Sequence, residues 1–404
     1  MQTLFVDQLN AFEKLRQFKV GALFMEPGTG KTRTAYELVN SVENIDYILY
    51  LAPYRTIHTE NYEESVVAEI EKCGGFKVDY DFIGIETLSG SDRTYLELTS
   101  KIQHHNTFIV CDESLKIKNW DAKRTKRIVQ LGTYTEYKLI LNGTPLSRNV
   151  LDIWAQLEFL SPKILGMGLA EYKNTFVKYT TITKKINGIK LKKEIIDGYE
   201  NIDYLYSIIK HYVYECDLKL DVSKHYRERS YYIDDDVAEE YARIKEFMLN
   251  NEYLMFRNNN IFIELMQQLQ HAYCCTSNKF EVVESILSGE WEDQTIIFCK
   301  FIKSRDALVK LFPNVKVLTY GKHAYGLNLQ DYNTVIFFDK TMDFALRLQA
   351  ERRVFRSGQI TDCTYYDLTG NVGLEAMINR NIDKKESMLN YFKRVSFEQL
   401  MNEL

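Results

Sequence analysis

The sequence predicts an α/β protein with two parallel-sheet domains and a helical and β-hairpin segment inserted between them. Short apolar runs alternate with helical patterns before residue 141 and again after residue 230, as in successive βαβ units. Asn187-Gly188 lies within an alternating segment, which is the strongest short hairpin signal. We expect a first domain at 1–160, an inserted segment at 161–225 with a basic hairpin near 179–196, and a second domain at 226–404.

The first domain opens with an amphipathic helix within residues 1–19, followed by alternating strands and helices. Continuous apolar runs predict strands that are buried in a parallel sheet, and these are 20–24, 47–52, 82–85, 107–111 and 137–141. Helical patterns separate them, at 33–42, 65–73, 95–103 and 122–131.

The remaining chain continues with helices and a second series of strands. The predicted helices are 151–160, 239–249, 261–273, 280–287, 304–311 and a helical C-terminus from Leu374. The predicted strands are 295–298, 315–319 and 333–338.

Composition excludes some classes of protein. The chain has 404 residues, and its 45% hydrophobic and 26% charged content is typical of a globular protein. No apolar run could span a bilayer and residues 1–8 do not resemble a signal peptide, so we expect a cytoplasmic protein without membrane contact. The cysteines lack metal-ligand spacing, and the adjacent Cys274 and Cys275 are expected to pack rather than to do redox chemistry.

Charge does not identify a nucleic-acid-binding protein from the whole chain. The net charge is −5, although basic residues cluster at 116–127, 184–193 and 224–229. Each cluster taken alone is more often a solvated surface than a binding patch.

Residues 25–32, MEPGTGKT, stand between an apolar strand and a helix and predict a phosphate-binding loop. Gly28, Thr29 and Gly30 would fold tightly enough to aim backbone N–H groups at phosphate oxygens. Lys31 would contact the β- and γ-phosphates, and the Thr32 hydroxyl would bind Mg²⁺. Met25 replaces the usual first glycine of this pattern. The alternative is a glycine-rich turn that binds nothing.

An acid pair at the end of a buried strand would complete a nucleotide-hydrolase site. Asp112 and Glu113 follow the apolar run 107–111 directly. Asp112 would hold Mg²⁺ together with Thr32, and Glu113 would polarise the water that attacks the γ-phosphate. The alternative is an ordinary acidic turn after a strand.

Motifs in order along nearly the whole chain resemble those of the Swi/Snf-type superfamily-two helicases. The stretches that carry the resemblance are ALFMEPGTGKT (22–32), DESLKIKN (112–119), LNGTPLSRN (141–149), DIWAQLEFLSP (152–162), TIIFCKF (295–301), YGLNLQDYNTVIFFD (325–339) and QAERRVFRSGQ (349–359). The resemblance implies two RecA-like domains that hydrolyse ATP with Mg²⁺ in the cleft between them. The compact size resembles members that bacteriophages encode.

The resemblance also implies roles for single residues. Gln8 would read the adenine. Arg353 and Arg356 would be arginine fingers that contact the γ-phosphate, and they would act in catalysis together with Glu113 and Lys31. Thr144, Asn328 and Gln349 would couple the nucleotide site to the nucleic-acid track. Candidate nucleic-acid contacts by motif position are Arg55, Thr56, Lys118, Asn119, Arg148 and Thr319.

The sequence departs from this family at several places. Leu115 replaces the histidine of motif II, and His323-Ala324 stand where motif V usually has two glycines. The stretch from Phe298 to Asn328 is short for the family, so we expect a shortened second domain.

The predicted hairpin carries a separate hypothesis. Lys184, Lys190 and Lys192 are expected on one strand face, where they could contact a duplex or act as a strand-separating pin. A solvated edge kept soluble by lysines is the alternative.

We therefore expect an ATP-dependent DNA translocase that moves on double-stranded DNA and acts as a monomer; single strands and RNA stay open as partners. A strand-separating helicase acting on forks or recombination intermediates is one alternative. An ATP-switched nucleic-acid-binding or recruitment protein with little motor activity is another.

Overall fold

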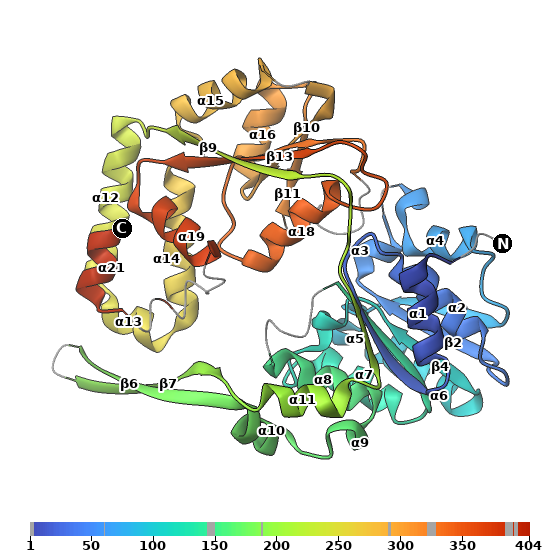
Figure 1. Ribbon diagram of the computed structural model, residues 1–404. Coiled ribbons are helices and arrows are strands. Elements are labelled where there is room, and N and C mark those ends of the chain that lie inside the picture. Colours follow the sequence, from blue (N-terminus) through green and yellow to red (C-terminus); the bar gives the residue numbers. More distant parts are fainter. Residues whose placement is uncertain are drawn as a thin grey trace. The chain divides into compact units, whose positions relative to one another are not determined.

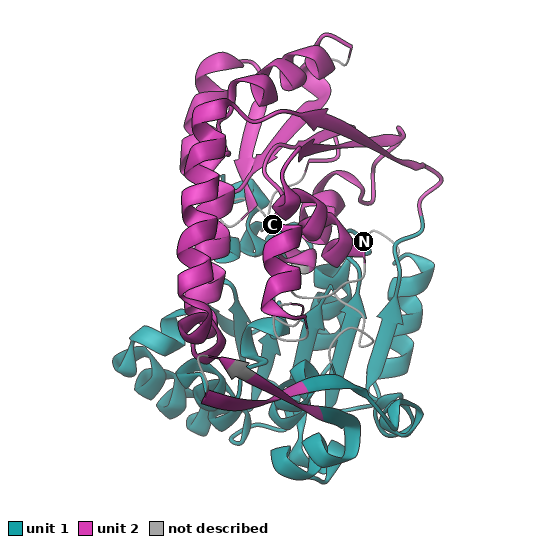
Figure 2. Cartoon of the chain, turned by 90° about the vertical axis from the view of Figure 1, so that its left-hand side faces the viewer, with its two compact units in different colours: residues 1–179, 196–219 teal, residues 180–195, 220–404 magenta. Residues whose placement is uncertain are grey.

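The computed structural model describes residues 4–59, 61–143, 150–186, 189–289, 292–320, 329–383, 391 and 395–404. The chain forms two compact units, the first made of 1–179 and 196–219 and the second of 180–195 and 220–404 (Figure 2). Each unit contains a parallel sheet with helices on both faces (Figure 1), so the predicted α/β class with two parallel sheets is confirmed.

The sheet of the first unit has six parallel strands in the order β3-β2-β4-β5-β1-β8. Their bounds are β1 Val20–Met25, β2 Tyr47–Ala52, β3 Asp79–Gly84, β4 Thr107–Cys111, β5 Tyr137–Asn142 and β8 Val213–Cys216. Because neighbouring strands run the same way, the loops after β1 and β4 leave the sheet at one edge.

Helices cover both faces of this sheet because its central strands are apolar on both sides. Ile48 and Tyr50 pack on one face, whereas Tyr47, Leu49 and Leu51 pack on the other. The first face is covered by α1 (Val6–Leu15), α2 (Lys31–Asn40) and α4 (Val66–Lys72). The second face is covered by α6 (Asp92–His104), α7 (Lys123–Gly132), α8 (Leu151–Leu160), α10 (Leu169–Phe176) and α11 (Ile202–Ile209).

Short helical turns connect these elements in the first unit. They are α3 (Tyr54–Ile57), η1 (Tyr62–Glu64), α5 (Thr87–Gly90), η2 (Ser114–Ile117) and α9 (Pro162–Leu165). Two of them, α3 and η2, directly follow the carboxyl ends of β2 and β4 and carry candidate site residues.

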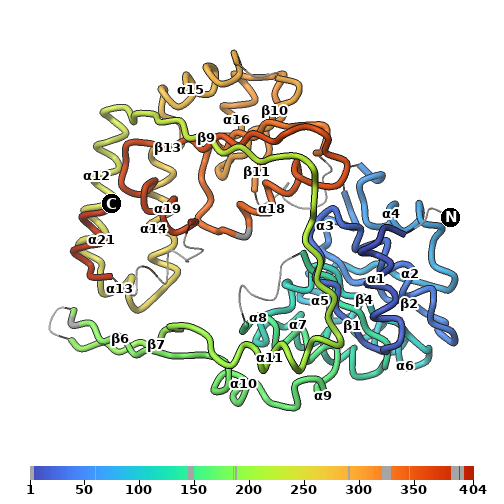
Figure 3. Tube along the Cα trace, in the orientation of Figure 1, coloured from blue at the N-terminus to red at the C-terminus, as the bar shows by residue number. Residues whose placement is uncertain are grey.

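The second unit has a five-stranded parallel sheet in the order β11-β10-β12-β13-β9. The strands are β9 Lys224–Tyr231, β10 Thr295–Cys299, β11 Lys316–Thr319, β12 Thr334–Phe337 and β13 Cys363–Gly370. All eight residues of β9 pair with β13, from Lys224 opposite Cys363 to Tyr231 opposite Gly370, and Figure 3 shows these two distant segments side by side.

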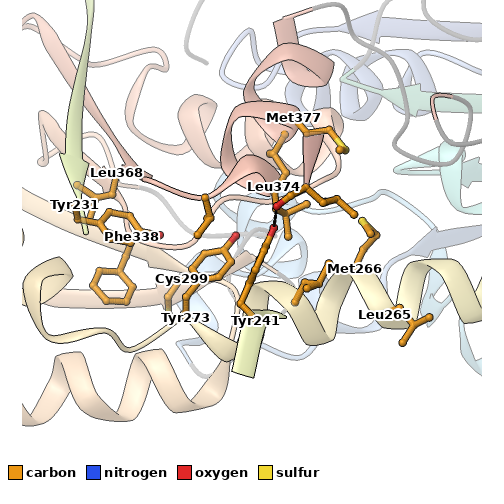
Figure 4. Close-up of a cluster of buried hydrophobic side chains, with 14 of the residues drawn as sticks. Tyr231, Tyr241, Leu265, Met266, Tyr273, Cys299, Phe338, Leu368, Leu374 and Met377 are labelled. Carbon is orange, nitrogen blue, oxygen red and sulfur yellow. Dashed lines mark hydrogen bonds between the residues drawn. The ribbon is translucent and has the colours of Figure 1, made fainter. Parts of the chain in front are cut away.

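A large apolar cluster fills the space between this sheet and most helices of the unit (Figure 4). The helices that contribute to it are α12 (Asp235–Asn250), α13 (Glu252–Arg257), α14 (Asn259–Ala272), α15 (Ser277–Leu287), α16 (Ile302–Leu311), α19 (Gly373–Asp383) and α21 (Phe397–Glu403). On the opposite face, α18 (Phe344–Val354) packs through Ala350 and Val354, and a short turn, η4 (Glu292–Gln294), precedes β10. No helix in the described ranges is both long and apolar enough to cross a membrane.

The predicted hairpin is present as β6 (Val177–Ile186) and β7 (Ile189–Tyr199). Its residues 180–195 belong to the second unit, while both strand ends belong to the first. The segment expected as an insert, 161–225, also supplies β8 to the first sheet and the start of β9 to the second.

The two faces of the hairpin differ in chemistry. Lys184 and Lys193 both lie over the ring of Phe256, at 5.4 and 5.6 Å, and Lys193 Nζ donates to the Phe256 carbonyl at 3.2 Å. Since Lys190 and Lys192 alternate with Lys193 along β7, they lie on the opposite, exposed face. The prediction that Lys184 shares a face with Lys190 and Lys192 is therefore wrong, because Lys184 packs against the protein.

A buried ion pair supports the second sheet. Lys279 Nζ lies 2.8 Å from Asp339 Oδ1, and both side chains are 1% exposed. The other carboxylate oxygen, Oδ2, accepts the Lys300 N–H at 3.0 Å. Removing one member of such a pair leaves an uncompensated buried charge.

Lys279→Ala is therefore expected to lower the free energy of unfolding of the protein by about 3–5 kcal/mol. The measurement is urea unfolding followed by circular dichroism. Arg243→Ala is the control, because Arg243 forms an exposed pair with Glu240 on the same unit and should change stability by less than about 1 kcal/mol. Equal effects of the two substitutions would contradict the role assigned to the buried pair.

Candidate nucleotide and nucleic-acid site

The loop between β1 and α2 has the backbone conformation of a phosphate cradle. Gly28 and Gly30 have φ of 89° and 83°, in the left-handed region that favours glycine. Helix α2 begins at Lys31, so its free N–H groups and the positive end of its dipole face this loop. The local geometry expected for an anion site is therefore present in residues 28–32.

Lys31 and Met25 together explain why the loop tolerates a missing first glycine. Lys31 Nζ donates to the Met25 carbonyl oxygen at 2.8 Å, while the Met25 side chain is completely buried in the core. Only the backbone of Met25 is required by the loop, since its side chain points into the sheet packing as the last residue of β1.

Helix α1 brings Gln8 against the same loop. Gln8 Nε2 donates to the Thr29 carbonyl at 3.2 Å, and Gln8 Oε1 accepts the Phe5 N–H at 3.1 Å. A Cβ added to Gly30 would come within 2.0 Å of Gln8 Nε2. Gln8 is 5% exposed, so its amide is held at the loop by these two bonds.

The acid pair leaves β4 in a strained turn. Glu113 has a φ of 49°, which is uncommon for a residue other than glycine, and its N–H donates to Asp112 Oδ1 at 2.8 Å. Burial raises the pKa of Asp112, and repulsion from Glu113 raises it further, while the Lys31 ammonium lowers it. Tyr50 on β2 donates to Asp112 Oδ2 at 3.4 Å.

This donor set fits Mg²⁺ bound jointly by protein and phosphate. Among the residues that the structure describes, no group of three or more His, Cys, Asp or Glu side chains could hold a metal ion. Mg²⁺ in phosphate sites commonly uses only one or two protein ligands, with waters and phosphate oxygens completing the octahedron. Thr32 on the first turn of α2 and Asp112 after β4 are the residues that would hold it.

Two further contacts at this edge were not predicted from the sequence. Ser114 Oγ donates to Gln156 Oε1 at 2.5 Å, so the turn after the acid pair is bonded to α8. Gly143, after β5, lies so close to the loop that an added Cβ would meet the Pro27 ring at 3.1 Å. Neither contact can be predicted from the sequence around Ser114 or Gly143, because both contacts depend on how separate helices and strands pack.

The second unit contains the predicted arginine fingers and one coupling residue on or just after α18. Arg353, through its carbonyl, accepts the Leu329 N–H at 3.3 Å, and Gln359 Nε2 donates to the Gln330 and Tyr332 carbonyls at 3.1 and 2.8 Å. Residues 349–359, which include Gln349, Arg353 and Arg356, are therefore hydrogen-bonded directly to residues 329–332. Thr144, Arg148 and Asn328 lie outside the described residues.

The candidate nucleic-acid residues of the first unit follow strands β2 and β4, which are neighbours in the sheet. Arg55 and Thr56 are on α3, with Arg55 exposed and Thr56 Oγ1 bonded to the Pro53 carbonyl at 2.8 Å. Lys118 and Asn119 are exposed after η2, and Lys118 Nζ lies 3.0 Å from Asp152. In the second unit, Thr319 ends β11 and is 8% exposed.

Comparison with known proteins places the chain among related sequences. A family model described as the SNF2-related domain matches residues 56–275, more than half of the chain. The DNA repair and recombination protein RAD26 of Saccharomyces cerevisiae is 24% identical over 339 residues, which are 69% of this chain and 31% of RAD26. An uncharacterized ATP-dependent helicase of Mycoplasma genitalium, MG018, is 21% identical over 333 residues, covering 73% and 32% of the two chains.

The chain thus spans about a third of the length of these curated relatives. Among solved structures, the SWI2/SNF2 ATPase core of Sulfolobus solfataricus in complex with double-stranded DNA aligns with a TM-score of 0.43 and 20% sequence identity. The alignment covers 100% of this chain and 97% of that one.

The contact between Gly30 and Gln8 generates a test of the loop. Gly30→Ala should lower the free energy of unfolding by about 1–2 kcal/mol, because an L-residue is strained at this φ and the added Cβ displaces the Gln8 amide from Thr29. Chemical denaturation measures the change. Gly90→Ala is the matched control, since an added Cβ there meets nothing within 4 Å and the φ is not positive; a comparable loss at Gly90 would contradict the interpretation.

Proposed function

The chain belongs to the SNF2-related family, and we propose that it is an ATP-dependent translocase that moves on double-stranded DNA. The observation that supports this most directly is the arrangement of the phosphate loop and the acid pair. Lys31, at the start of α2, and Asp112, after β4, are close enough for the lysine to lower the carboxyl pKa. A strand–loop–helix phosphate cradle beside such an acid pair is the arrangement that nucleotide hydrolysis requires.

Each residue of the first unit has a defined role in this proposal. The backbone N–H groups of 28–32 and the Lys31 ammonium bind the phosphates, and Gln8 on α1 recognises the adenine beside the loop. Bound Mg²⁺ would neutralise phosphate charge when it is held by Thr32 and Asp112. Glu113, held in its strained backbone conformation next to Asp112, orients and deprotonates the attacking water.

Residues of the second unit complete the proposal. Arg353 and Arg356 supply positive charge to the transition state as arginine fingers, and Gln349 couples that step to the nucleic-acid track. The bonds from Gln359 to the carbonyls of Gln330 and Tyr332 support this role, because they tie the arginine segment to the turn that precedes β12. A movement of one segment would therefore carry the other with it.

DNA is the proposed track. Arg55, Thr56, Lys118 and Asn119 follow adjacent parallel strands at the edge where the acid pair also lies, which gives a line of phosphate contacts beside the nucleotide residues. The exposed lysines of the hairpin, Lys190 and Lys192, would add a second contact. Contacts to phosphate carry no sequence information, so the proposed binding is independent of DNA sequence.

Replacing Glu113 by glutamine tests the catalytic part of the proposal. Glu113→Gln should retain ATP binding and lose about 10²–10⁴-fold in turnover, because the amide cannot accept the proton of the attacking water. ATP hydrolysis is measured with and without duplex DNA, and Glu97→Gln, on the exposed surface of α6, is the control. Normal ATP turnover by Glu113→Gln would exclude the role assigned to Glu113. If DNA does not change the ATP turnover of the unmodified protein, an ATP-switched binding protein would be favoured instead.

The hairpin hypothesis has a separate test. Replacing Lys190 and Lys192 together by serine should lower DNA-stimulated hydrolysis and leave basal hydrolysis unchanged, since both side chains are exposed away from the core. Lys178→Ser, an exposed lysine near the hairpin base that pairs with Glu200, is the matched control. Unchanged stimulation would exclude the contact between these lysines and DNA.

Release of strands from a fork by the unmodified protein would identify a strand-separating helicase instead of a duplex translocase.

A further inference from the structure

Two adjacent thiols lie in the turn between α14 and α15, and neither has a role in the proposed nucleotide or nucleic-acid site. Cys274 Sγ lies 3.7 Å from Cys275 Sγ and is oriented to donate to it. Cys274 is completely buried, whereas Cys275 is partly exposed. The thiol of a buried cysteine is therefore in direct contact with that of a partly exposed cysteine.

The first turn of α16 lies next to Cys275. Ser304 Oγ, on that turn, is 4.0 Å from Cys275 Sγ and is buried. A helix N-terminus and hydroxyl or thiol donors stabilise a thiolate over a neutral thiol. Consistent with this geometry, the hydrogen bond from Cys274 lowers the pKa of Cys275 to about 7. The Ser304 hydroxyl and the Lys303 ammonium also lower this pKa, whereas burial and the Asp339 carboxylate oppose the shift.

We propose that Cys275 is a peroxide-sensitive thiol and that Cys274 is its resolving partner. The Cys275 thiolate attacks one oxygen of a hydroperoxide, whose O–O bond breaks, giving the sulfenic acid of Cys275 and, after protonation, water or an alcohol. The Cys274 thiol then attacks the sulfenic sulfur, and water leaves as the Cys274–Cys275 disulfide forms. Two electrons from the thiols reduce one hydroperoxide.

The product would be readily reversed. Consecutive Cα atoms are about 3.8 Å apart, shorter than the roughly 4.4–6.8 Å common in disulfides. A disulfide between neighbours is therefore strained, and strained disulfides are reduced more easily than structural ones. This is the behaviour of a reversible modification rather than of a permanent crosslink.

Oxidation would also affect a buried contact. The Cys274 carbonyl accepts a hydrogen bond from Lys279 Nζ at 3.3 Å, and the same ammonium group forms the buried pair with Asp339. Closing a ring across the Cys274–Cys275 peptide would move this carbonyl. We therefore expect the oxidised protein to unfold at a lower temperature than the reduced protein.

The decisive measurement uses the full chain at pH 7 with limiting iodoacetamide and peptide mass mapping. Cys275 should be labelled about fivefold to tenfold faster than Cys73 and Cys216, two partly exposed cysteines without a neighbouring thiol in sequence. Equal or slower labelling of Cys275 would overturn the proposal, and this result needs no substitution that could disturb folding.

Treatment with hydrogen peroxide tests the resolving step. The peptide containing Cys274 and Cys275 should lose two hydrogens, regain them with dithiothreitol, and give no sulfenic-acid adduct with dimedone. In Cys274→Ser, dimedone should label Cys275, and in Ser304→Ala the loss of two hydrogens should be slower. A dimedone adduct that persists on Cys275 of the unmodified protein would show that Cys274 does not resolve it and would overturn the assignment.

Discussion

Two consecutive carboxylates, those of Asp112 and Glu113, emerge from a strand whose neighbours are apolar, and the Lys31 ammonium opposes the charge of Asp112. This electrostatic balance constrains how the strands of the first unit are arranged, because burial and mutual repulsion both disfavour two adjacent negative charges that have no positive charge nearby. Lys31 can provide the balance only if β1 and β4 end at the same edge of the sheet. A parallel sheet satisfies that condition for every strand, whatever the distance in sequence.

The same constraint accounts for the contacts around the pair. The Met25 carbonyl holds the Lys31 side chain, the Tyr50 hydroxyl and the Glu113 N–H bond to Asp112, and Gln156 holds the following turn through Ser114. These partners come from strands β1 and β2, the turn after β4 and helix α8. The nucleotide residues are thus positioned by the packing of the whole unit and not by the loop alone.

Much of this arrangement could be predicted from local pattern. The apolar runs 47–52 and 107–111 are strands with the predicted bounds, and the helix 151–160 also begins and ends where its periodicity indicates. The positive φ angles of Gly28 and Gly30 follow from the loop motif, since other residues are strained there.

The remaining elements depend on long-range pairing. Strand β9 has the sequence KHYRERSY and shows no apolar run, and it is a strand because β13 pairs with all eight of its residues. Strand β8 has only four residues and β13 mixes polar with aromatic side chains, so neither stands out as a strand in the sequence. The face of Lys184 was predicted incorrectly because its partner, Phe256, lies far away in the chain.

The route of the chain through the two units has a practical consequence for dissecting the protein. The first unit is assembled from two separate stretches, 1–179 and 196–219, and the later stretch contributes β8 beside β1. A fragment that stops before β8 would leave β1, the apolar strand VGALFM, with unpaired N–H and C=O groups along one side. Such an edge invites intermolecular strand pairing and aggregation. A fragment of the first unit therefore has to extend to residue 219 to keep β8, and residues 180–195, which belong to the second unit, can be replaced by a short linker.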